Sequence, residues 1–312
     1  MKKIYTKEFV ERIAWDKGFI KDNIEKVLRL IDILEFLNTD KRLEGKLVLK
    51  GGTAINLAVI DFPRLSVDID LDFSENLDKD SIAIFRTNFR KILNEFIEAE
   101  GYRLNEKPRV HYALDSFMLN YNGTSGNREN IKVEINYLNR AHLLPLECRN
   151  IYERLIEEPL KVLTLNPIEL YASKAVALLS RTAPRDLYDM YTMIEKDIIN
   201  DKELFRKCFI FYNACAGEQN AGNLDFSKFE KFTFDIIRRQ LKPLLSKDDR
   251  FDVKQAVPVV SKYLQTTLVL SEKEKEFIRL FREKVYKPEL LFDDKTIIKR
   301  IETHPMILWR LR

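Results

Sequence analysis

Glycine, cysteine and histidine are all scarce in this chain. The 9 glycines among 312 residues are less than half of the usual share of about 7%, which excludes collagen-like and glycine-rich linker architectures. The three cysteines, Cys148, Cys208 and Cys215, are widely spaced and form no CxxC pair, so neither a disulfide scaffold nor a cysteine-based zinc site is expected. The three histidines are equally scattered and offer no metal-ligand spacing.

Long apolar runs and a strong charge of one sign are also missing. No stretch approaches the roughly 18 apolar residues that a membrane span requires, and Glu8 and Glu11 stand where a signal peptide needs an apolar segment. We therefore expect a cytoplasmic protein in a reducing compartment, without a membrane partner. The 53 Lys and Arg against 49 Asp and Glu give a net charge of +4, so any affinity for nucleic acid must come from a local basic patch.

The pattern of the chain changes near residue 160. Before it, hydrophobic periodicity predicts strands over residues 46–50, 67–73, 110–121 and 131–138 and a helix over residues 79–99. The last two strands are predicted to form a hairpin. Beyond it, nearly every segment has helical spacing, beginning at the capping residue Asn166 and Pro167. We predict an α+β fold, with a small mixed β-sheet and flanking helices in residues 1–160. A mainly helical C-terminal half, residues 161–312, is expected to complete an active-site cleft.

Three aspartates share one face of the predicted strand 67–73. Its sequence, VDIDLDF, alternates strictly, so Asp68, Asp70 and Asp72 project from the same side of the strand. Like charges in this arrangement oppose folding unless something neutralises them. A divalent cation is a natural partner, because Mg²⁺ binds one or two carboxylates together with phosphate oxygens. The alternation by itself favours an ordinary strand with one solvated face.

A Gly-Gly-Thr sequence upstream changes that interpretation. Gly51, Gly52 and Thr53 lie between a predicted strand and a predicted helix, where backbone N–H groups can point at an anion and glycine permits close approach. A Gly-Gly pair alone is more often an ordinary turn. Followed by Asp-x-Asp on the next strand, it predicts a phosphate-binding turn beside a metal-binding strand.

The segment KGGTAINLAVIDFPRLSVDIDLDF, residues 50–73, resembles the first motif of the AbiEii/AbiGii-type toxins, which include the MenT-like proteins. These toxins are nucleotidyltransferases of the DNA-polymerase-β-like superfamily, whose pattern is Gly-Gly or Gly-Ser, a helix, and then Asp-x-Asp. The family adds Arg-x-Ser before the acids, seen here as Arg64 and Ser66. The resemblance implies a nucleotidyltransferase core in which these two residues bind the nucleotide together with the glycine turn.

The same resemblance assigns the acidic residues. By the Ser-x-Asp-x-Asp pattern, Asp68 and Asp70 are the catalytic metal ligands, and Asp72 is the alternate ligand to Asp68. Superfamily members commonly add a third carboxylate from a neighbouring strand, and Glu134 fits that position. Taken alone, Glu134 fits a solvent-facing strand residue equally well.

A second motif of the family lies in the helical half. Residues 169–191, ELYASKAVALLSRTAPRDLYDMY, resemble the toxins' lysine on one helix followed by Arg-Asp-x-x-Asp at the start of the next. The resemblance implies that Lys174 and Arg185 bind the phosphates of the nucleotide, and that Lys174, Asp186 and Asp189 are catalytic. From the residues alone, Lys174 would rather snorkel out of its apolar stretch, and Arg185 and Asp189 would form a helical i,i+4 ion pair.

Together the motifs imply a metal-dependent nucleotidyltransferase, with Mg²⁺ or Mn²⁺ as cofactor, that transfers NMP from an NTP and releases pyrophosphate. The resemblance further implies a tRNA or other RNA acceptor, a toxin–antitoxin role of the phage-defence type, and a cognate antitoxin protein as partner. Two alternatives stay open: a nucleotidyltransferase that modifies a protein or small molecule, and a nucleotide-binding regulatory module without turnover. The second aspartate disfavours the module, because a non-catalytic binder does not need it.

The tail, residues 295–312, carries five basic residues against one acid, with Trp309 among them. Basic residues beside an aromatic ring can contact RNA, and Arg310 and Arg312 are the candidates here. A solvated helix face and a packed C-terminus explain the same residues, and this second interpretation is favoured.

Overall fold

The computed structural model describes residues 5–105, 109–151, 160–218, 220–222 and 224–312. Its internal contacts divide the chain into two compact units. The sheet unit consists of residues 1–140, 146–164 and 244–248, and the helical unit consists of residues 141–145, 165–243 and 249–312. The domain division at residue 160 that the sequence indicates stays a prediction.

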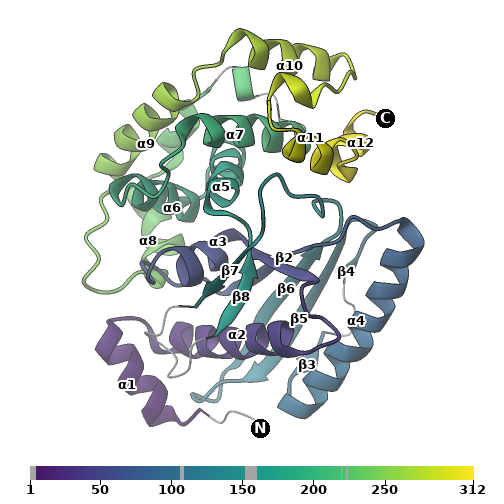
Figure 1. The fold of residues 1–312 in the computed structure, drawn as a ribbon. Helices are drawn as coiled ribbons and strands as arrows, with labels where there is room; N and C mark the ends of the chain where they lie inside the picture. Colours follow the sequence, from purple (N-terminus) through teal and green to yellow (C-terminus); the bar gives the residue numbers. More distant parts are fainter. Residues whose placement is uncertain (1–4, 106–108, 152–159, 219, 223) are drawn as a thin grey trace. The chain divides into compact units, whose positions relative to one another are not determined.

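The sheet unit is built on one mixed β-sheet (Figure 1). Its strands are β1 (Leu47–Lys50), β2 (Asp68–Phe73), β3 (Arg103–Leu104), β4 (Arg109–Val110), β5 (Leu114–Asn122), β6 (Arg128–Asn136), β7 (Glu147–Asn150) and β8 (Lys161–Thr164). They are ordered β3-β5-β6-β2-β1-β8-β7, and β4 pairs with β5. The central β2 runs parallel to β6 and antiparallel to β1, while β1 and β8 are parallel.

The sheet confirms the predicted α+β class. The alternating run becomes β2, in which Ile69, Leu71 and Phe73 are buried. The predicted hairpin forms as the antiparallel pair β5 and β6. The chain beyond residue 160 is mainly helical, as predicted, and the four-residue strand β8 is held there by its partners β1 and β7 rather than by a periodicity of its own.

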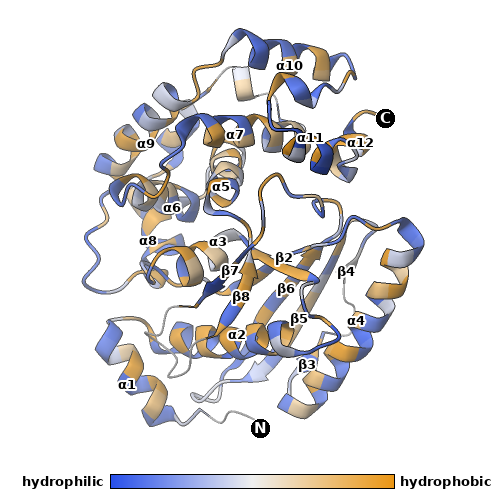
Figure 2. Cartoon of the chain, viewed as in Figure 1, coloured by the Kyte–Doolittle hydropathy of each residue, from blue (hydrophilic) through white to orange (hydrophobic). Residues whose placement is uncertain are grey.

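Two helices of the sheet unit, α2 (Lys21–Thr39) and α4 (Lys79–Glu100), cover one face of this sheet (Figure 1). The unit also contains α1 (Lys7–Lys17) and α3 (Gly51–Ala54) with the π-helix η1 (Ile55–Val59). The rings of Phe36 in α2 and Phe96 in α4 stack with centroids 4.2 Å apart, and Phe85 of α4 packs on Phe73 of β2 at 4.5 Å. Figure 2 shows apolar residues concentrated on the strands and on α2 and α4. Because β2 alternates, its aspartates point to the opposite face of the sheet.

The helical unit contains α-helices and short 3₁₀ turns, and its first helix begins after a capping residue. Its helices are α5 (Pro167–Arg181), α6 (Pro184–Glu195), α7 (Lys202–Ala216), α8 (Phe234–Gln240), α9 (Val253–Thr267), α10 (Glu272–Arg282), α11 (Lys295–Ile301) and α12 (Pro305–Arg310), with short 3₁₀ turns η2 (Asn220–Gly222), η3 (Ser227–Lys231), η4 (Lys242–Leu244) and η5 (Pro288–Leu290). As predicted, the side chain of Asn166 caps α5, accepting a hydrogen bond from the N–H of Ile168 at 2.9 Å. None of the described helices is long and apolar enough to cross a membrane.

The C-terminal tail packs against α7. The guanidinium of Arg310 donates a 3.0 Å hydrogen bond to the carbonyl of Cys215 and another to that of Ala216, and it lies 4.7 Å from the ring centroid of Trp309. These carbonyls belong to the last turn of α7, where a helix leaves acceptors without intrahelical partners. Arg310 therefore serves the packed C-terminus that the sequence favoured.

Candidate active site

The aspartates of β2 lie in the middle of the sheet, on the face opposite α2 and α4. Backbone pairing places Asp70 opposite Lys50 of β1 and beside Glu134 of β6, and it places Asp68 beside Lys132. Residues paired in this way project from the same face of a sheet. The register therefore brings the predicted metal ligands Asp68, Asp70 and Glu134 together with two lysines.

The pKa of Asp70 is raised above its ordinary value. Burial is the largest cause, and the negative charges of Asp68 and Glu134 raise the pKa further, while Lys50 and Lys132 lower it. The ionised form of Asp70 is thus disfavoured even with two cations in reach. A carboxylate in this state gains from any additional positive charge beside it.

Asp72, the third acid of the run, has a different environment. It is 2% exposed, and its Oδ1 lies 2.5 Å from the ammonium of Lys50. This ion pair ties β2 to β1 and supplies the neutralising charge that a buried carboxylate needs. The two aspartates nearer the start of β2, Asp68 and Asp70, remain partly exposed, which favours them over Asp72 as ligands.

The two glycines let the backbone approach these side chains. Gly51 has a φ of +68°, and a Cβ built on it would lie 2.7 Å from Oδ2 of Asp70. A Cβ on Gly52 would lie 2.8 Å from Nη2 of Arg64 and 3.1 Å from Oγ of Ser66. A side chain at either position would therefore displace a neighbouring side chain, whereas the approach of a phosphate to these glycines stays a prediction.

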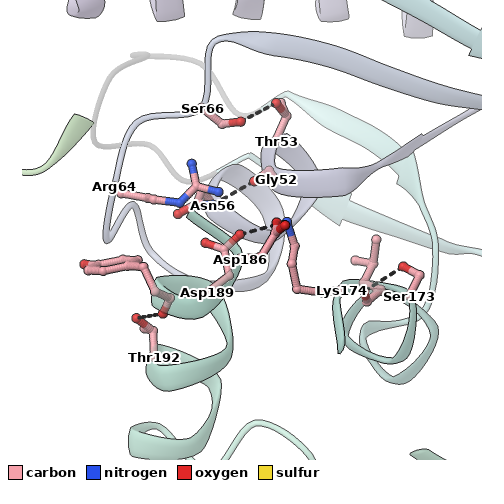
Figure 3. A network of polar contacts seen from close by, with 12 residues as sticks. Gly52, Thr53, Asn56, Arg64, Ser66, Ser173, Lys174, Asp186, Asp189 and Thr192 are labelled. Atoms are coloured by element: carbon pink, nitrogen blue, oxygen red, sulfur yellow. Dashed lines mark hydrogen bonds and ion pairs between the residues drawn. The ribbon is translucent and has the colours of Figure 1, made fainter. Parts of the chain in front are cut away.

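The residues after the glycines hold the turn in place, as Figure 3 shows. The hydroxyl of Thr53 lies 2.9 Å from that of Ser66 and also donates to the carbonyl of Asp68. Asn56 donates to the carbonyl of Gly52 at 2.7 Å. The bonds of Thr53 run from the helix that follows the glycines to Ser66 and to the start of β2, whereas the bond of Asn56 stays within the turn. The side chains of Thr53 and Ser66 thus position backbone groups.

Arg64 is almost fully buried beneath this turn, with 1% of its surface exposed. Its Nη1 donates to the carbonyl of Leu65 at 2.8 Å, and the backbone of Leu65 bonds to the carbonyl of Leu244. The guanidinium therefore lies behind Gly52. Its assignment to the nucleotide stays a prediction, as does that of Ser66.

Glu134 is already paired. Its Oε2 lies 3.0 Å from Nζ of Lys132, two residues earlier on the same strand face. Across the described ranges, no group of three or more His, Cys, Asp or Glu side chains is arranged to hold a metal ion. Glu134 as a third metal ligand stays a prediction.

The second motif forms an ion-pair network inside the helical unit (Figure 3). Lys174 of α5 is 6% exposed, and its ammonium lies 2.8 Å from Oδ1 of Asp186 and 3.0 Å from Oδ2 of Asp189, both on α6. Arg181 binds the same Asp186 at 2.7 and 2.9 Å. Lys174 therefore does not snorkel from the apolar stretch around it. It is a buried cation shared by two buried carboxylates.

The network fixes the charge of Asp186. Burial raises its pKa, but the positive charges of Lys174 and Arg181 and their hydrogen bonds outweigh burial and bring the pKa down to about 2. Asp186 is consequently ionised throughout the physiological range. Arg185, in the first turn of α6, is partly buried.

Sequence reasoning missed three cations: Lys50 and Lys132, which lie beside the aspartates of β2, and Arg181, which belongs to the ion-pair network of Lys174. Lys132 follows from the alternation of β6, because it stands two residues before Glu134 and must share its face. Arg181 is seven residues after Lys174, two turns along the same side of α5. Lys50 directly precedes the glycines, but its pairing with Asp72 depends on the register of β1 against β2.

Comparison with known proteins identifies the family. The sequence profile described as "Nucleotidyl transferase AbiEii toxin, Type IV TA system" matches residues 34–269, which is more than half of the chain and includes both motifs. MenT4, a nucleotidyltransferase toxin from Mycobacterium tuberculosis H37Rv, has a similar structure: the TM-score is 0.63 at 16% sequence identity, covering 99% of this chain and 100% of that one. At this identity the likeness establishes the fold. No curated protein sequence matches significantly. The chain belongs to the AbiEii family and is a nucleotidyltransferase toxin of a type IV toxin–antitoxin system.

Proposed function

We propose that this toxin transfers a nucleoside monophosphate from an NTP to a hydroxyl group of an RNA, with tRNA as the first candidate, and that a cognate antitoxin restrains it. The acceptor oxygen forms a bond to the α-phosphorus while the bond from that phosphorus to the bridging oxygen breaks. Pyrophosphate leaves with the electron pair, and the hydroxyl proton passes to water. The observation that carries this proposal is the pair Asp68 and Asp70 beside a glycine turn that fits closely around Asp70.

The donor set at β2 fits a hard divalent cation such as Mg²⁺ or Mn²⁺. Asp68 and Asp70 offer carboxylate oxygens, and the raised pKa of Asp70 reflects burial and unrelieved negative charge that a cation would offset. Two carboxylates plus substrate phosphate oxygens are a usual environment for Mg²⁺. A bound ion would supply positive charge for the triphosphate and for the attacking oxygen. Glu134 is the candidate for a third ligand, once released from Lys132.

The glycine turn is assigned to the β- and γ-phosphates. Gly51 and Gly52 present backbone without side chains next to Asp70, and a phosphate can approach such backbone closely. Thr53 and Ser66 are assigned to keeping the turn in shape, because their hydroxyls bond to each other. Arg64 is assigned to supporting Gly52 from behind.

In the helical unit, Lys174 and Arg185 are assigned to charge that develops on the leaving pyrophosphate. Asp186 is a poor proton acceptor, because its pKa of about 2 lies far below the pH at which a general base works best. We therefore assign Asp186 to holding Lys174 and Arg181 in position. Asp189, the second partner of Lys174, is the candidate that orients the lysine or the acceptor.

Label transfer tests the proposal directly. The purified toxin is incubated with Mg²⁺, total RNA and each of the four NTPs in turn, labelled on the α-phosphate. The proposal expects label in RNA with one or more NTPs, and none when the label is on the γ-phosphate, because that phosphate leaves as pyrophosphate. Addition of EDTA should stop the transfer.

The same experiment separates the alternative acceptors. Label that resists ribonuclease and migrates with protein, or that appears in a small molecule, would overturn the RNA assignment while leaving a nucleotidyltransferase. Asp293→Asn is a control for substitutions of the site's acids, because it removes a carboxylate that is exposed on the surface of the helical unit. This variant should transfer label normally. Inhibition by the neighbouring gene's product would identify the antitoxin.

A further inference from the structure

A second pocket lies in the sheet unit, on the side of α4. Its cavity measures about 360 Å³, a size within the range of small-ligand sites. It is lined by the first half of α4, the chain before β5 and the chain after β6: Lys79, Ile82, Ala83, Arg86, Thr87, Arg90, His111, Tyr112, Tyr137, Leu138 and Arg140. Along β6, Tyr137 alternates with Glu134 and Asn136, so this pocket lies on the face opposite the aspartates of β2.

The pocket is strongly basic. Four of its lining side chains, Lys79, Arg86, Arg90 and Arg140, are cations, and no described lining residue is a carboxylate. Asp115, which is fully buried, binds Arg86 at 2.6 Å and Arg90 at 3.3 Å, and Asp78 and Asp80 flank Lys79 along the chain. The charged side chains that line the cavity itself are all cations. Such a local field attracts anions on a chain that is nearly neutral as a whole.

Some donors of this pocket are not satisfied. The Nε atoms of Arg90 and Arg140 are buried and have no hydrogen-bond acceptor among the described residues. Among the described residues, Arg140 donates hydrogen bonds to the carbonyls of Tyr137 and Leu77, and burial lowers the pKa of its guanidinium. A buried guanidinium Nε without an acceptor costs free energy unless a ligand supplies one.

Tyr112 adds a flat, solvent-facing surface. Its side chain lines the same pocket and is 64% exposed. Arginines beside an exposed aromatic ring are the combination that single-stranded nucleic acid uses, since phosphates bind the cations and a base stacks on the ring. An acidic protein segment would use the cations but would have no specific use for the ring.

We propose that this pocket holds one nucleotide unit of the RNA substrate, with its phosphate on Lys79, Arg90 and Arg140 and its base on Tyr112. The proposal rests on the RNA acceptor proposed above and assigns it a binding site separate from the catalytic face. Arg86 serves as a positioning residue here, because its nitrogens are already bound to Asp115 and to the carbonyls of His111 and Tyr112.

Equilibrium binding of a short fluorescein-labelled oligouridylate, without NTP or divalent metal, tests the site. Tyr112→Ala should weaken binding at least about fivefold, the value of one lost stacking contact. The double variant Lys79→Gln/Arg90→Gln should reduce the slope of log affinity against log salt by up to about 1.4, since each phosphate contact to a single strand contributes about 0.7. The matched control is Lys91→Gln, which removes an exposed charge from the same helix outside the pocket and should leave the slope near that of wild type.

Each other result counts against the site. No oligonucleotide binding by the wild type, or equal affinity and salt slope in wild type and pocket variants of equal melting temperature, would overturn the proposal. A polyglutamate peptide that displaces the oligonucleotide while Tyr112→Ala has no effect would make the pocket a protein-docking surface instead. Failure of the acceptor proposal is separate: label would miss RNA in the transfer assay while the pocket variants still lost oligonucleotide affinity.

Discussion

Any side chain at position 51 would collide with the carboxylate of Asp70, because a Cβ there lies 2.7 Å from Oδ2. Gly51→Ala must therefore displace Asp70, in addition to the strain of a φ of +68°. We expect the variant to fold, with about 1 kcal/mol less stability, and to lose at least about tenfold in label transfer, the effect of about 1.4 kcal/mol in the transition state.

Gly45→Ala is the control for that substitution. Gly45 has nearly the same backbone conformation, with a φ of +71°, and a Cβ added to it would meet no atom within 4 Å. The stability of this variant, measured by urea denaturation, should fall only by the strain of the positive φ, and its transfer rate should stay that of the wild type. Equal rates in the two variants would mean that the approach of Gly51 to Asp70 has no catalytic consequence.

Asp70→Asn should abolish transfer and leave the fold intact or stabilised. Burial raises the folded-state pKa of Asp70, so the ionised form costs stability at neutral pH, and this cost disappears as the pH falls through the folded-state pKa. The gain of the Asn variant should therefore be largest near neutral pH and vanish in acid. Thermal melting at several pH values measures the gain, and near-wild-type turnover with Mg²⁺ would contradict the assignment of Asp70 as a metal ligand.

Asp72→Asn should behave in the opposite way. It leaves Lys50 without its 2.5 Å partner next to a buried amide, and breaking such a buried pair costs about 3–5 kcal/mol. We expect a clear loss of melting temperature. Transfer per folded molecule should remain, since Asp68 and Asp70 are intact. If Asp72→Asn instead kept its stability and lost its rate, Asp72 would replace Asp68 as a ligand.

Lys174→Met tests the buried cation of the helical unit. It leaves Asp186 and Asp189 facing each other without the ammonium between them, so the free energy of unfolding should fall by about 3–5 kcal/mol. A double-mutant cycle with Asp189→Asn should recover part of this loss, because the second substitution removes one of the stranded charges. A change in the free energy of unfolding within about 0.5 kcal/mol, as for an exposed lysine, would show that the ion pairs of Lys174 do not stabilise the fold.

Because the pKa of Asp186 is lowered, part of the free energy of unfolding should be lost in acid. A folded-state pKa of about 2, against an ordinary 3.8, contributes about 2 kcal/mol that is fully present above pH 4 and is lost as the pH falls toward 2. The stability difference between wild type and Asp186→Asn should shrink over that range. For the exposed Asp293→Asn the difference should stay small at every pH. A constant difference for Asp186→Asn would contradict the lowered pKa.

The sequence predicted those features that depend on neighbours along the chain. The alternation of residues 67–73 and the caps before Pro167 are local signals, and both elements form where they were expected. The three aspartates could not be told apart, since each has the same local pattern. What separates Asp72 is Lys50, 22 residues away, and the antiparallel register that brings them together.

For the same reason, the ion pairs of Lys174 could not be predicted from the local sequence pattern. Its apolar neighbours in α5 suggested a lysine that reaches for water, and only the packing of α5 on α6 supplies the two carboxylates. The basic pocket behind α4 was missed as well. Three of its cations lie on α4 and the fourth, Arg140, follows β6, and only the packing of the helix on the sheet brings them to one pocket.

The central position of β2 in the sheet determines how activity is lost when the sheet unit unfolds. This strand is hydrogen-bonded to β1 on one side and to β6 on the other. Each of its bonded amides donates to one of these neighbours, and both neighbours are themselves paired on their far sides, so exchange there requires the middle of the sheet to open. Such amides report the global free energy of unfolding, whereas those of the edge strands β3 and β7 exchange by fraying. The acids of β2 thus belong to the last part of the sheet unit to open. Catalytic activity should survive damage at the sheet's edges and disappear in a single step, together with the slowest-exchanging amides.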